Sequence, residues 1–255
     1  MRRVHLFELE DQPWYPAAIR DAATDFLRFV LENGDVYAPA VPLLQDLLAR
    51  YGNPQIVDLC SGGGGPWRRF LDALGPQVQV CLTDLYPNRL AWEKLRADSK
   101  GQITFYPDPV DASTTPLDLH GVRILFTALH HFPPKQARAV LADAVRHREP
   151  IAAFEFTERS LRGLLLSAAS PLMVWLATPH IRPMGAARLI WTYLIPLVPL
   201  TVLVDGMISC LRTYSPQELR GLTEGLEGYT WESGVVRGRS PFAVTYLIGY
   251  PAQDA

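Results

Sequence analysis

The sequence of 255 residues has few cysteines and almost no net charge. Its three cysteines are odd in number and far apart, which argues against a disulfide framework and favours a reducing compartment, so we expect a cytoplasmic location. Charged residues, and no apolar signal core, follow Met1, so we expect no export signal. A net charge of −2 lacks the electrostatic footprint of a nucleic-acid partner, and we expect none.

The sequence also lacks an uncharged run long enough to cross a bilayer. The two longest runs, between Arg162 and His180 and between Arg188 and Asp205, are shorter than the roughly 20 residues of a spanning helix, and prolines interrupt them. We interpret residues 158–212 as a helical apolar cap, packed on the sheet or lining an apolar acceptor pocket. Contact with a bilayer is the alternative, because tryptophans, a tyrosine and flanking arginines would suit a membrane interface.

The segment from Ile56 to Gly75 is the most informative part of the chain. Apolar residues on both sides of Asp58 are typical of a parallel strand that is covered on both faces. Four glycines at positions 62–65 allow the backbone to turn sharply and to approach a ligand closely. Pro66 fits the first turn of a helix, apolar residues follow at helical spacing, and Gly75 supplies the stop. This order directs free backbone amides at a bound small molecule.

Two common ligands of such loops do not fit. The dinucleotide fingerprint needs a third glycine or an alanine, and that place falls on Trp67 or Arg68. The phosphate loop of nucleotide triphosphatases needs a lysine followed by serine or threonine, and neither is present. The carboxylate of Asp58, just before the loop, would repel a polyanion and would suit a cationic ligand.

The run from Asp58 to Gly64 resembles the first motif of the class I S-adenosylmethionine-dependent methyltransferases. That motif is an acidic residue, an apolar residue and Gly-x-Gly-x-Gly, and here Cys60 stands in the first glycine place. The resemblance covers about residues 50–157 and 213–250. It implies S-adenosylmethionine as cofactor and S-adenosylhomocysteine as product.

The order of the predicted elements agrees with this resemblance. Apolar periodicity predicts helices near residues 16–32, 39–50 and 135–147, and strands at residues 229–236 and 243–250. Alternating strands and helices favour an α/β fold. We therefore expect a doubly wound, mainly parallel seven-stranded sheet of the Rossmann-like methyltransferase type, with a C-terminal antiparallel hairpin.

Acidic residues follow two further predicted strands. The strand at residues 78–83 ends at Asp84, which the resemblance assigns to the two ribose hydroxyls; a carboxylate at the start of the next helix is the alternative. The strand at residues 102–106 leads to Asp111, assigned to the adenine amino group, with Asp108 as the second choice and a proline-pinned turn as the alternative. The implied cofactor-binding residues are Asp58, Cys60, Gly62, Gly64, Asp84, Leu85, Asp111, Ala112 and Thr127.

The fourth predicted strand, at residues 122–127, precedes a Leu-His-His-Phe run that small-molecule methyltransferases often show over the methyl group. His130 and His131 are the candidate catalytic bases, because a histidine holds a proton near neutral pH. A histidine bonded to backbone in this turn is the alternative. The candidate substrate-binding residues are Trp14, Tyr15, Glu155, Asp205 and Arg212. Glu155 lies in the fifth predicted strand, at residues 151–156, and faces either the site or a buried partner such as an arginine.

We expect one methyltransferase domain over residues 1–255. Its parts are an N-terminal helical segment at 1–50, a cofactor-binding core at 51–157, the apolar cap at 158–212, and a C-terminal helix and hairpin at 213–255 that begins with a capping box at Ser215. Glu8, Glu10 and Asp11 are interpreted as exposed acidic surface, and contact with an amine acceptor is the alternative.

The predicted function is transfer of the methyl group of S-adenosylmethionine to a small, lipophilic acceptor at oxygen, nitrogen or carbon. No metal ligand set is predicted. One alternative is a cyclisation or rearrangement that uses the same cofactor. Another is a non-catalytic S-adenosylmethionine-binding or membrane-associated protein.

Overall fold

The computed structural model describes residues 1–182 and 184–252. Its chain forms two compact units. The first, here called the helical unit, comprises Met1–Asp35 and Thr157–Thr213; the second, the sheet unit, comprises Val36–Phe156 and Tyr214–Ala255. Most of the predicted N-terminal segment and the whole range of the predicted cap thus belong to the helical unit. The last three residues of the predicted C-terminal segment lie outside the described residues.

The sheet unit is built on a seven-stranded sheet in the order β3-β2-β1-β4-β5-β7-β6. Neighbours among β1 to β5 pair in parallel, and β7 runs antiparallel to both β5 and β6. The predicted sheet with its C-terminal antiparallel hairpin is confirmed. The strands are β1 (Gln55–Asp58), β2 (Gln79–Leu82), β3 (Ile103–Phe105), β4 (Val122–Phe126), β5 (Ile151–Glu155), β6 (Tyr229–Arg237) and β7 (Ala243–Pro251).

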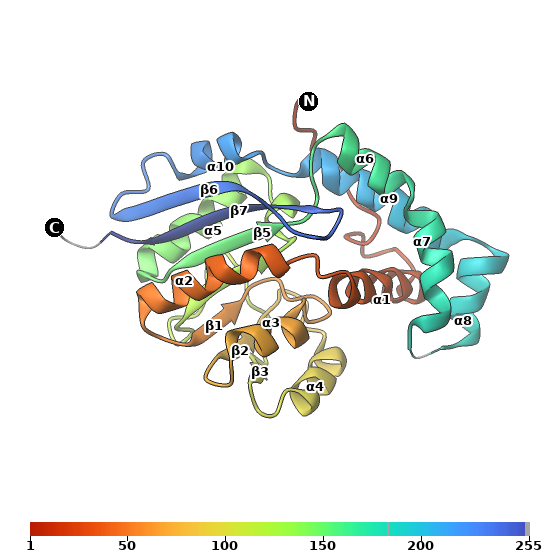
Figure 1. The fold of residues 1–255 in the computed structure, drawn as a ribbon, viewed down its shortest axis with the longest axis horizontal. Helices are drawn as coiled ribbons and strands as arrows, with labels where there is room; N and C mark the ends of the chain where they lie inside the picture. The colour runs from red at the N-terminus through yellow and green to blue at the C-terminus, as the bar shows by residue number, and fades with distance from the viewer. Residues whose placement is uncertain (183, 253–255) are drawn as a thin grey trace. The chain divides into compact units, whose positions relative to one another are not determined.

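Helices lie on both faces of this sheet (Figure 1). They are η1 (Ala38–Ala40), α2 (Val41–Tyr51), α3 (Trp67–Leu74), α4 (Arg89–Asp98), η2 (Leu129–His131), α5 (Pro134–His147) and α10 (Pro216–Thr223). α2 packs beside α3, and α5 packs beside α10 on the opposite face. The strands and helices predicted for this unit are present, with ends that differ by one or two residues.

Local sequence features set several of these ends. Gly75 ends α3 with a φ of +95°, which a residue with a side chain rarely adopts. Ser215 and Glu218 form the predicted capping box, in which each side chain accepts from the other residue's backbone N–H, at 3.2 and 2.8 Å. Pro66 differs from the prediction: it is the N-cap of α3 and not part of its first turn, because its ψ of 17° keeps it in the loop.

The buried centre of the sheet consists of β1, β4 and β5. Every residue of β5 is buried, and in β1 only Gln55 is exposed. Such strands require helices on both faces, as their apolar sequences predict. The strand order reverses between β1 and β4, so the connections that follow these two strands leave toward opposite faces of the sheet. In α/β sheets, ligands bind at this point, outside the carboxyl ends of the strands.

The helical unit has a core of its own. It contains α1 (Ala17–Asn33), α6 (Leu161–Ala168), α7 (Ser170–Ala177), η3 (Thr178–His180), α8 (Ala186–Leu189), η4 (Ile190–Leu194) and α9 (Leu197–Arg212). α1, α6 and α7 all pack on α9. The buried apolar side chains of this core are Ile19, Ala22, Ala23, Phe26, Val174, Ala177, Ile181, Val198 and Val202.

Prolines divide the apolar sequence of this unit into short helices. Pro171 and Pro199 lie in the first turns of α7 and α9, and Pro196 directly precedes α9. Among the described residues, no single helix is long and apolar enough to cross a membrane. Two pairs of consecutive helices meet that criterion only when taken together, and they are bent by 41° and 71° where they join.

A buried ion pair joins β4 to α5 in the sheet unit. Arg123 Nη1 lies 2.6 Å from Asp143 Oδ2, and both side chains are almost completely inaccessible to solvent. The hydroxyl of Thr115 donates to the same carboxylate at 2.6 Å. Arg146 also pairs with this carboxylate, at 3.2 Å, but its own side chain is 61% exposed.

We expect Asp143→Ala to lower the free energy of unfolding by about 3–5 kcal/mol, because it leaves the buried guanidinium of Arg123 without its counter-ion. Arg146→Ala is the matched control. It removes an exposed partner of the same carboxylate and should cost no more than about 1 kcal/mol. Urea unfolding of the two variants tests this, and equal losses would contradict it.

Candidate functional site

The loop between β1 and α3 has a backbone that glycine favours. Positive φ angles occur at Gly62 (+49°), Gly64 (+105°) and Gly65 (+57°), and also at Cys60 (+59°). A Cβ added at Gly64 would lie 1.9 Å from Leu95 Cδ1, because the loop runs directly against α4. The loop is therefore both sharply turned and closely packed.

Cys60 occupies the place in which the methyltransferase motif has its first glycine. It keeps the left-handed backbone that this place requires, although a side chain there costs about 1–2 kcal/mol. Its side chain packs against the apolar core of the sheet unit, which offsets part of that cost. The turn after β1 is thus formed despite the substitution.

Asp58, at the end of β1, is buried and holds the start of α3. Its Oδ2 accepts from the indole N–H of Trp67 at 2.7 Å. Burial raises the pKa of Asp58 to about 7, although the hydrogen bonds from Trp67 and Ser61 act in the opposite direction.

Asp84 lies beside the glycine loop. Its Oδ2 accepts from the N–H of Gly62 at 2.8 Å, and its Oδ1 accepts from the N–H of Tyr86 at 2.8 Å. Partial burial raises its pKa. Asp84 does not cap α4; Asn88 does, by accepting from the N–H of Ala91 at 3.2 Å. The alternative interpretation of Asp84 as a helix cap is therefore wrong.

Asp111 lies in the loop after β3. Its Oδ1 accepts from both the N–H and the hydroxyl of Ser113, at 2.8 and 2.7 Å, so the side chain stabilises its own turn. The N–H of Val110 donates to the carbonyl of Asp84 at 2.9 Å and joins this loop to the one after β2. Ala112 is buried, whereas Leu85 is 47% exposed. Three successive loops are thus linked at the carboxyl ends of their strands.

At the end of β4, Thr127 has a φ of +47°, a strained conformation for a β-branched residue. The hydroxyl of Tyr37 is hydrogen-bonded to the Thr127 hydroxyl and also donates to the carbonyl of Phe154 at 3.3 Å. Burial, followed by the nearby Glu155 carboxylate, raises the pKa of Tyr37 well above its ordinary value, so the phenol keeps its proton.

Tyr37 was missed by the sequence analysis. It lies in an aromatic cluster with Phe70, Phe126 and Phe156, with ring centroids 4.9–6.3 Å from its own. These four residues come from four separate parts of the chain, and no spacing in the sequence connects them. The only signal was an aromatic residue between two predicted helices.

His130 and Glu155 form a buried pair. His130 Nδ1 lies 2.7 Å from Glu155 Oε2, and the backbone N–H of His130 donates to Glu155 Oε1 at 3.2 Å. η2 carries the histidine at the carboxyl end of β4, and β5 ends on the glutamate. The sequence predicts that Glu155 faces either the site or a buried partner such as an arginine. The structure shows a buried partner, and that partner is His130. His131 is half-buried, with its ring 4.2 Å from that of His130.

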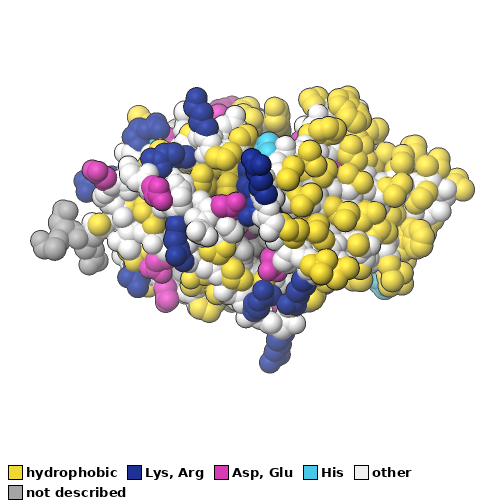
Figure 2. All heavy atoms as spheres, turned by 90° about the horizontal axis from the view of Figure 1, so that it is seen from above, with side chains coloured by type: hydrophobic (Ala, Val, Ile, Leu, Met, Phe, Trp, Pro, Cys, Tyr) yellow, Lys and Arg dark blue, Asp and Glu magenta, His cyan; other side chains and the backbone are white. Residues whose placement is uncertain are grey.

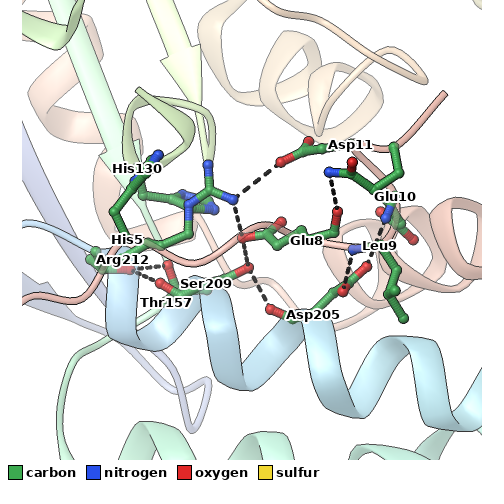
Figure 3. A network of polar contacts seen from close by, with 12 residues as sticks. His5, Glu8, Leu9, Glu10, Asp11, His130, Thr157, Asp205, Ser209 and Arg212 are labelled. Carbon is green, nitrogen blue, oxygen red and sulfur yellow. Dashed lines mark hydrogen bonds and ion pairs between the residues drawn. The ribbon is translucent and has the colours of Figure 1, made fainter. Parts of the chain in front are cut away.

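The remaining predicted substrate residues lie in the helical unit, in the polar network that Figure 3 shows in part. Asp205 accepts from the N–H groups of Leu9 and Glu10, at 2.8 and 3.0 Å. Arg212 pairs with Glu8 at 3.2 Å and with Asp11 at 3.1 Å. These contacts anchor the N-terminal segment to α9.

The interpretation of Glu8, Glu10 and Asp11 as exposed acidic surface is wrong for Glu8, which is 4% exposed because it is paired with Arg212. Burial, and then the charges of Asp205, Glu8 and Asp11, raise the pKa of Glu10 to about 8.

The two predicted aromatic residues of this unit differ from each other. Trp14 is 66% exposed. The hydroxyl of Tyr15 is hydrogen-bonded to that of Thr201 in α9.

Methyltransferases of known structure share this fold. A candidate O-methyltransferase of Nostoc punctiforme PCC 73102 matches 98% of this chain and 64% of its own, with a TM-score of 0.54 at 13% identity. The plantazolicin methyltransferase BpumL, solved in complex with S-adenosylhomocysteine, matches 96% of this chain and 93% of its own, with a TM-score of 0.51 at 11% identity. The S-adenosylmethionine-dependent methyltransferase SibL matches 85% of this chain and 56% of its own, with a TM-score of 0.51 at 13% identity.

The chain spans less than two thirds of the length of the Nostoc protein and of SibL. No family model and no curated protein matches the sequence. The structural matches and the strand order together assign the chain the class I methyltransferase fold.

Substitutions at Cys60 test the backbone of the loop. We expect Cys60→Gly to change the free energy of unfolding by less than about 1 kcal/mol, because relief of the left-handed strain offsets the lost packing and the added chain entropy. Cys60→Val should lower it by about 2 kcal/mol or more, since a β-branched residue is still less suited to this backbone. Thermal unfolding measures both. Equal losses would mean that the packing of the thiol, and not the backbone conformation of the turn, determines which side chain position 60 tolerates.

Proposed function

We propose that the protein transfers a methyl group from S-adenosylmethionine to a small, fairly lipophilic acceptor at oxygen, nitrogen or carbon. The observation that carries the proposal is the hydrogen bond from the N–H of Gly62 to Asp84, at the carboxyl ends of β1 and β2 and beside the point where the strand order reverses. It places an acceptor carboxylate beside a glycine loop at the position at which this fold binds ligands. The match to BpumL, a methyltransferase solved with S-adenosylhomocysteine, supports the choice of cofactor. In this proposal both units belong to one methyltransferase domain.

The residues of the sheet unit fit such a cofactor. Each carboxylate oxygen of Asp84 accepts one backbone N–H and keeps a further lone pair, so the group can still accept from two ribose hydroxyls. Asp111 would accept from the adenine amino group, beside Leu85 and Ala112. Cys60, Gly62 and Gly64 would present backbone to the amino-acid part, with Asp58 and Thr127 beneath it.

When bound, S-adenosylmethionine supplies an electrophilic methyl group on a sulfonium. The protein's own task is then to align the acceptor with that methyl group and to exclude water. A base is needed only if the acceptor arrives protonated.

His130 is the residue best placed to act as that base. Because Glu155 accepts a hydrogen bond from Nδ1, the neutral imidazole of His130 carries its proton on Nδ1. Its Nε2 is then the nitrogen that can take a proton from the methyl acceptor. The negative charge of Glu155 also stabilises the imidazolium that forms when Nε2 takes a proton from the acceptor. Glu155 is then a positioning residue, and His131 is the second candidate base.

The cofactor assignment is tested by calorimetry with S-adenosylhomocysteine. We expect Asp84→Ala to weaken binding by roughly 10- to 100-fold, because it removes the acceptor of two hydroxyl groups. Asp98→Ala is the control, since Asp98 is exposed at the end of α4 and should have little effect. Unchanged affinity in Asp84→Ala would remove this residue from the site. An intact protein that binds NADH in preference to S-adenosylhomocysteine would refute the cofactor itself.

The base assignment is tested by turnover with labelled methyl donor on an acceptor identified by product search. We expect His130→Ala to lower turnover about 100-fold or more while affinity for S-adenosylhomocysteine is kept. Glu155→Gln should also lower turnover while that affinity is kept, because the imidazolium loses its counter-charge. His131→Ala is the comparison. If both histidine variants keep near-normal turnover, catalysis is by alignment alone.

A further inference from the structure

The helical unit exposes an unusual amount of apolar surface. Of the 24 large apolar side chains that are exposed in the described residues, fourteen lie between Leu161 and Val204. The most exposed of these are Leu194 (75%), Leu161 (70%), Leu165 (62%) and Leu176 (62%). Figure 2 shows hydrophobic atoms covering the surface formed by α6 to α9. We call the exposed side chains of residues 161–204 the apolar surface.

These side chains are not needed for the unit's own core. That core is formed by the inward residues of α1, α7 and α9, such as Phe26, Val174 and Val198. The aromatic residues of the apolar surface also have their polar atoms bonded inside the unit. The indole N–H of Trp175 donates to the carbonyl of Thr192 at 3.1 Å, and the hydroxyl of Tyr193 donates to the carbonyl of Trp175 at 2.8 Å. Their rings can therefore enter an apolar medium without losing hydrogen bonds.

The charges of this segment are of one sign. Residues 159–204 contain four arginines and no aspartate or glutamate. Arg188 is paired with Asp25 of α1, whereas Arg182 is exposed at the edge of the apolar surface. Arginines beside an apolar surface, with tryptophan and tyrosine among its residues, are what an anionic membrane interface attracts.

We propose that the apolar surface docks on the surface of an anionic lipid bilayer and inserts its leucines among the lipids without crossing the membrane. The helices are too short and too bent at their joins for a single straight span. A second copy of the chain is a poorer occupant, because the exposed Arg182 would repel the same residue of the other copy in a two-fold contact, and residues 159–204 contain no carboxylate to pair it. This proposal does not depend on the reaction proposed above.

Flotation with vesicles tests the proposal. The whole protein is mixed with vesicles of phosphatidylcholine alone or with phosphatidylserine added, at low and high salt. We expect flotation with the anionic vesicles that high salt weakens but does not abolish, because apolar insertion is not screened. The double variant Leu176→Gln with Leu194→Gln should partition at least about tenfold more weakly. Arg182→Gln should reduce binding to the anionic vesicles only.

The matched control is the double variant Leu90→Gln with Leu117→Gln, whose side chains are 69% and 78% exposed in the sheet unit and should not affect flotation. All these positions are exposed, so the unfolding midpoint should stay unchanged and verifies that each variant is folded. The proposal is overturned if the protein floats with neither vesicle, or if both leucine pairs behave alike. It is equally overturned if the parent is a dimer that Leu176→Gln with Leu194→Gln dissociates. Retention in cell membranes after an alkaline carbonate wash would show spanning insertion instead and would also refute it.

Discussion

The backbone turn after β1 is the constraint on which the rest of the sheet unit depends. A buried parallel strand has to lead at once into α3, and it does so through left-handed residues at positions 60, 62, 64 and 65. Side chains from outside the turn hold it in place. Asp84 accepts from the N–H of Gly62, and the indole N–H of Trp92 donates to the carbonyl of Gly62. Trp67 donates to Asp58, which directly precedes the turn. Because the loop after β2, α3 and α4 each supply a contact, the shape of the glycine loop is set by the surrounding fold.

Buried polar groups are paired in this unit, and the end of the sheet at which a pair lies suggests its role. Arg123 is the second residue of β4 and pairs with Asp143 near the amino end of the strand, where no ligand site is expected, so the pair serves stability. His130 and Glu155 lie at the carboxyl ends of β4 and β5, the edge at which this fold binds ligands. The same physical requirement, that a buried charge must have a partner, thus yields a structural pair at one edge and a candidate catalytic pair at the other.

In the helical unit, Glu8 and Asp205 are buried, whereas most leucines of α6 and α7 are exposed. Glu8 is buried because Arg212 neutralises it, and Asp205 is satisfied by two backbone N–H groups. One side of α9 contacts these polar groups. Another side of α9 packs on α1 and α7, and these three helices supply the apolar core. Leucines of the short helices α6 to α8 then find no place in a core of this size. Their exposure follows from the amount of apolar sequence in a small unit.

The sequence by itself determined the strands, the helices, the glycine loop and the parallel sheet, because each depends on a local signal: an apolar run, a helical period, a capping box or a glycine that ends a helix. It also placed Asp84 and His130 at the ends of predicted strands. Only the tertiary structure decided which side chains meet. Tyr37 and Thr127, or His130 and Glu155, are joined by strand order and burial, which spacing along the chain does not encode. Burial of Glu8 and exposure of Leu194 were likewise decided by packing, because a charge enters a core only when a distant partner such as Arg212 is there to meet it.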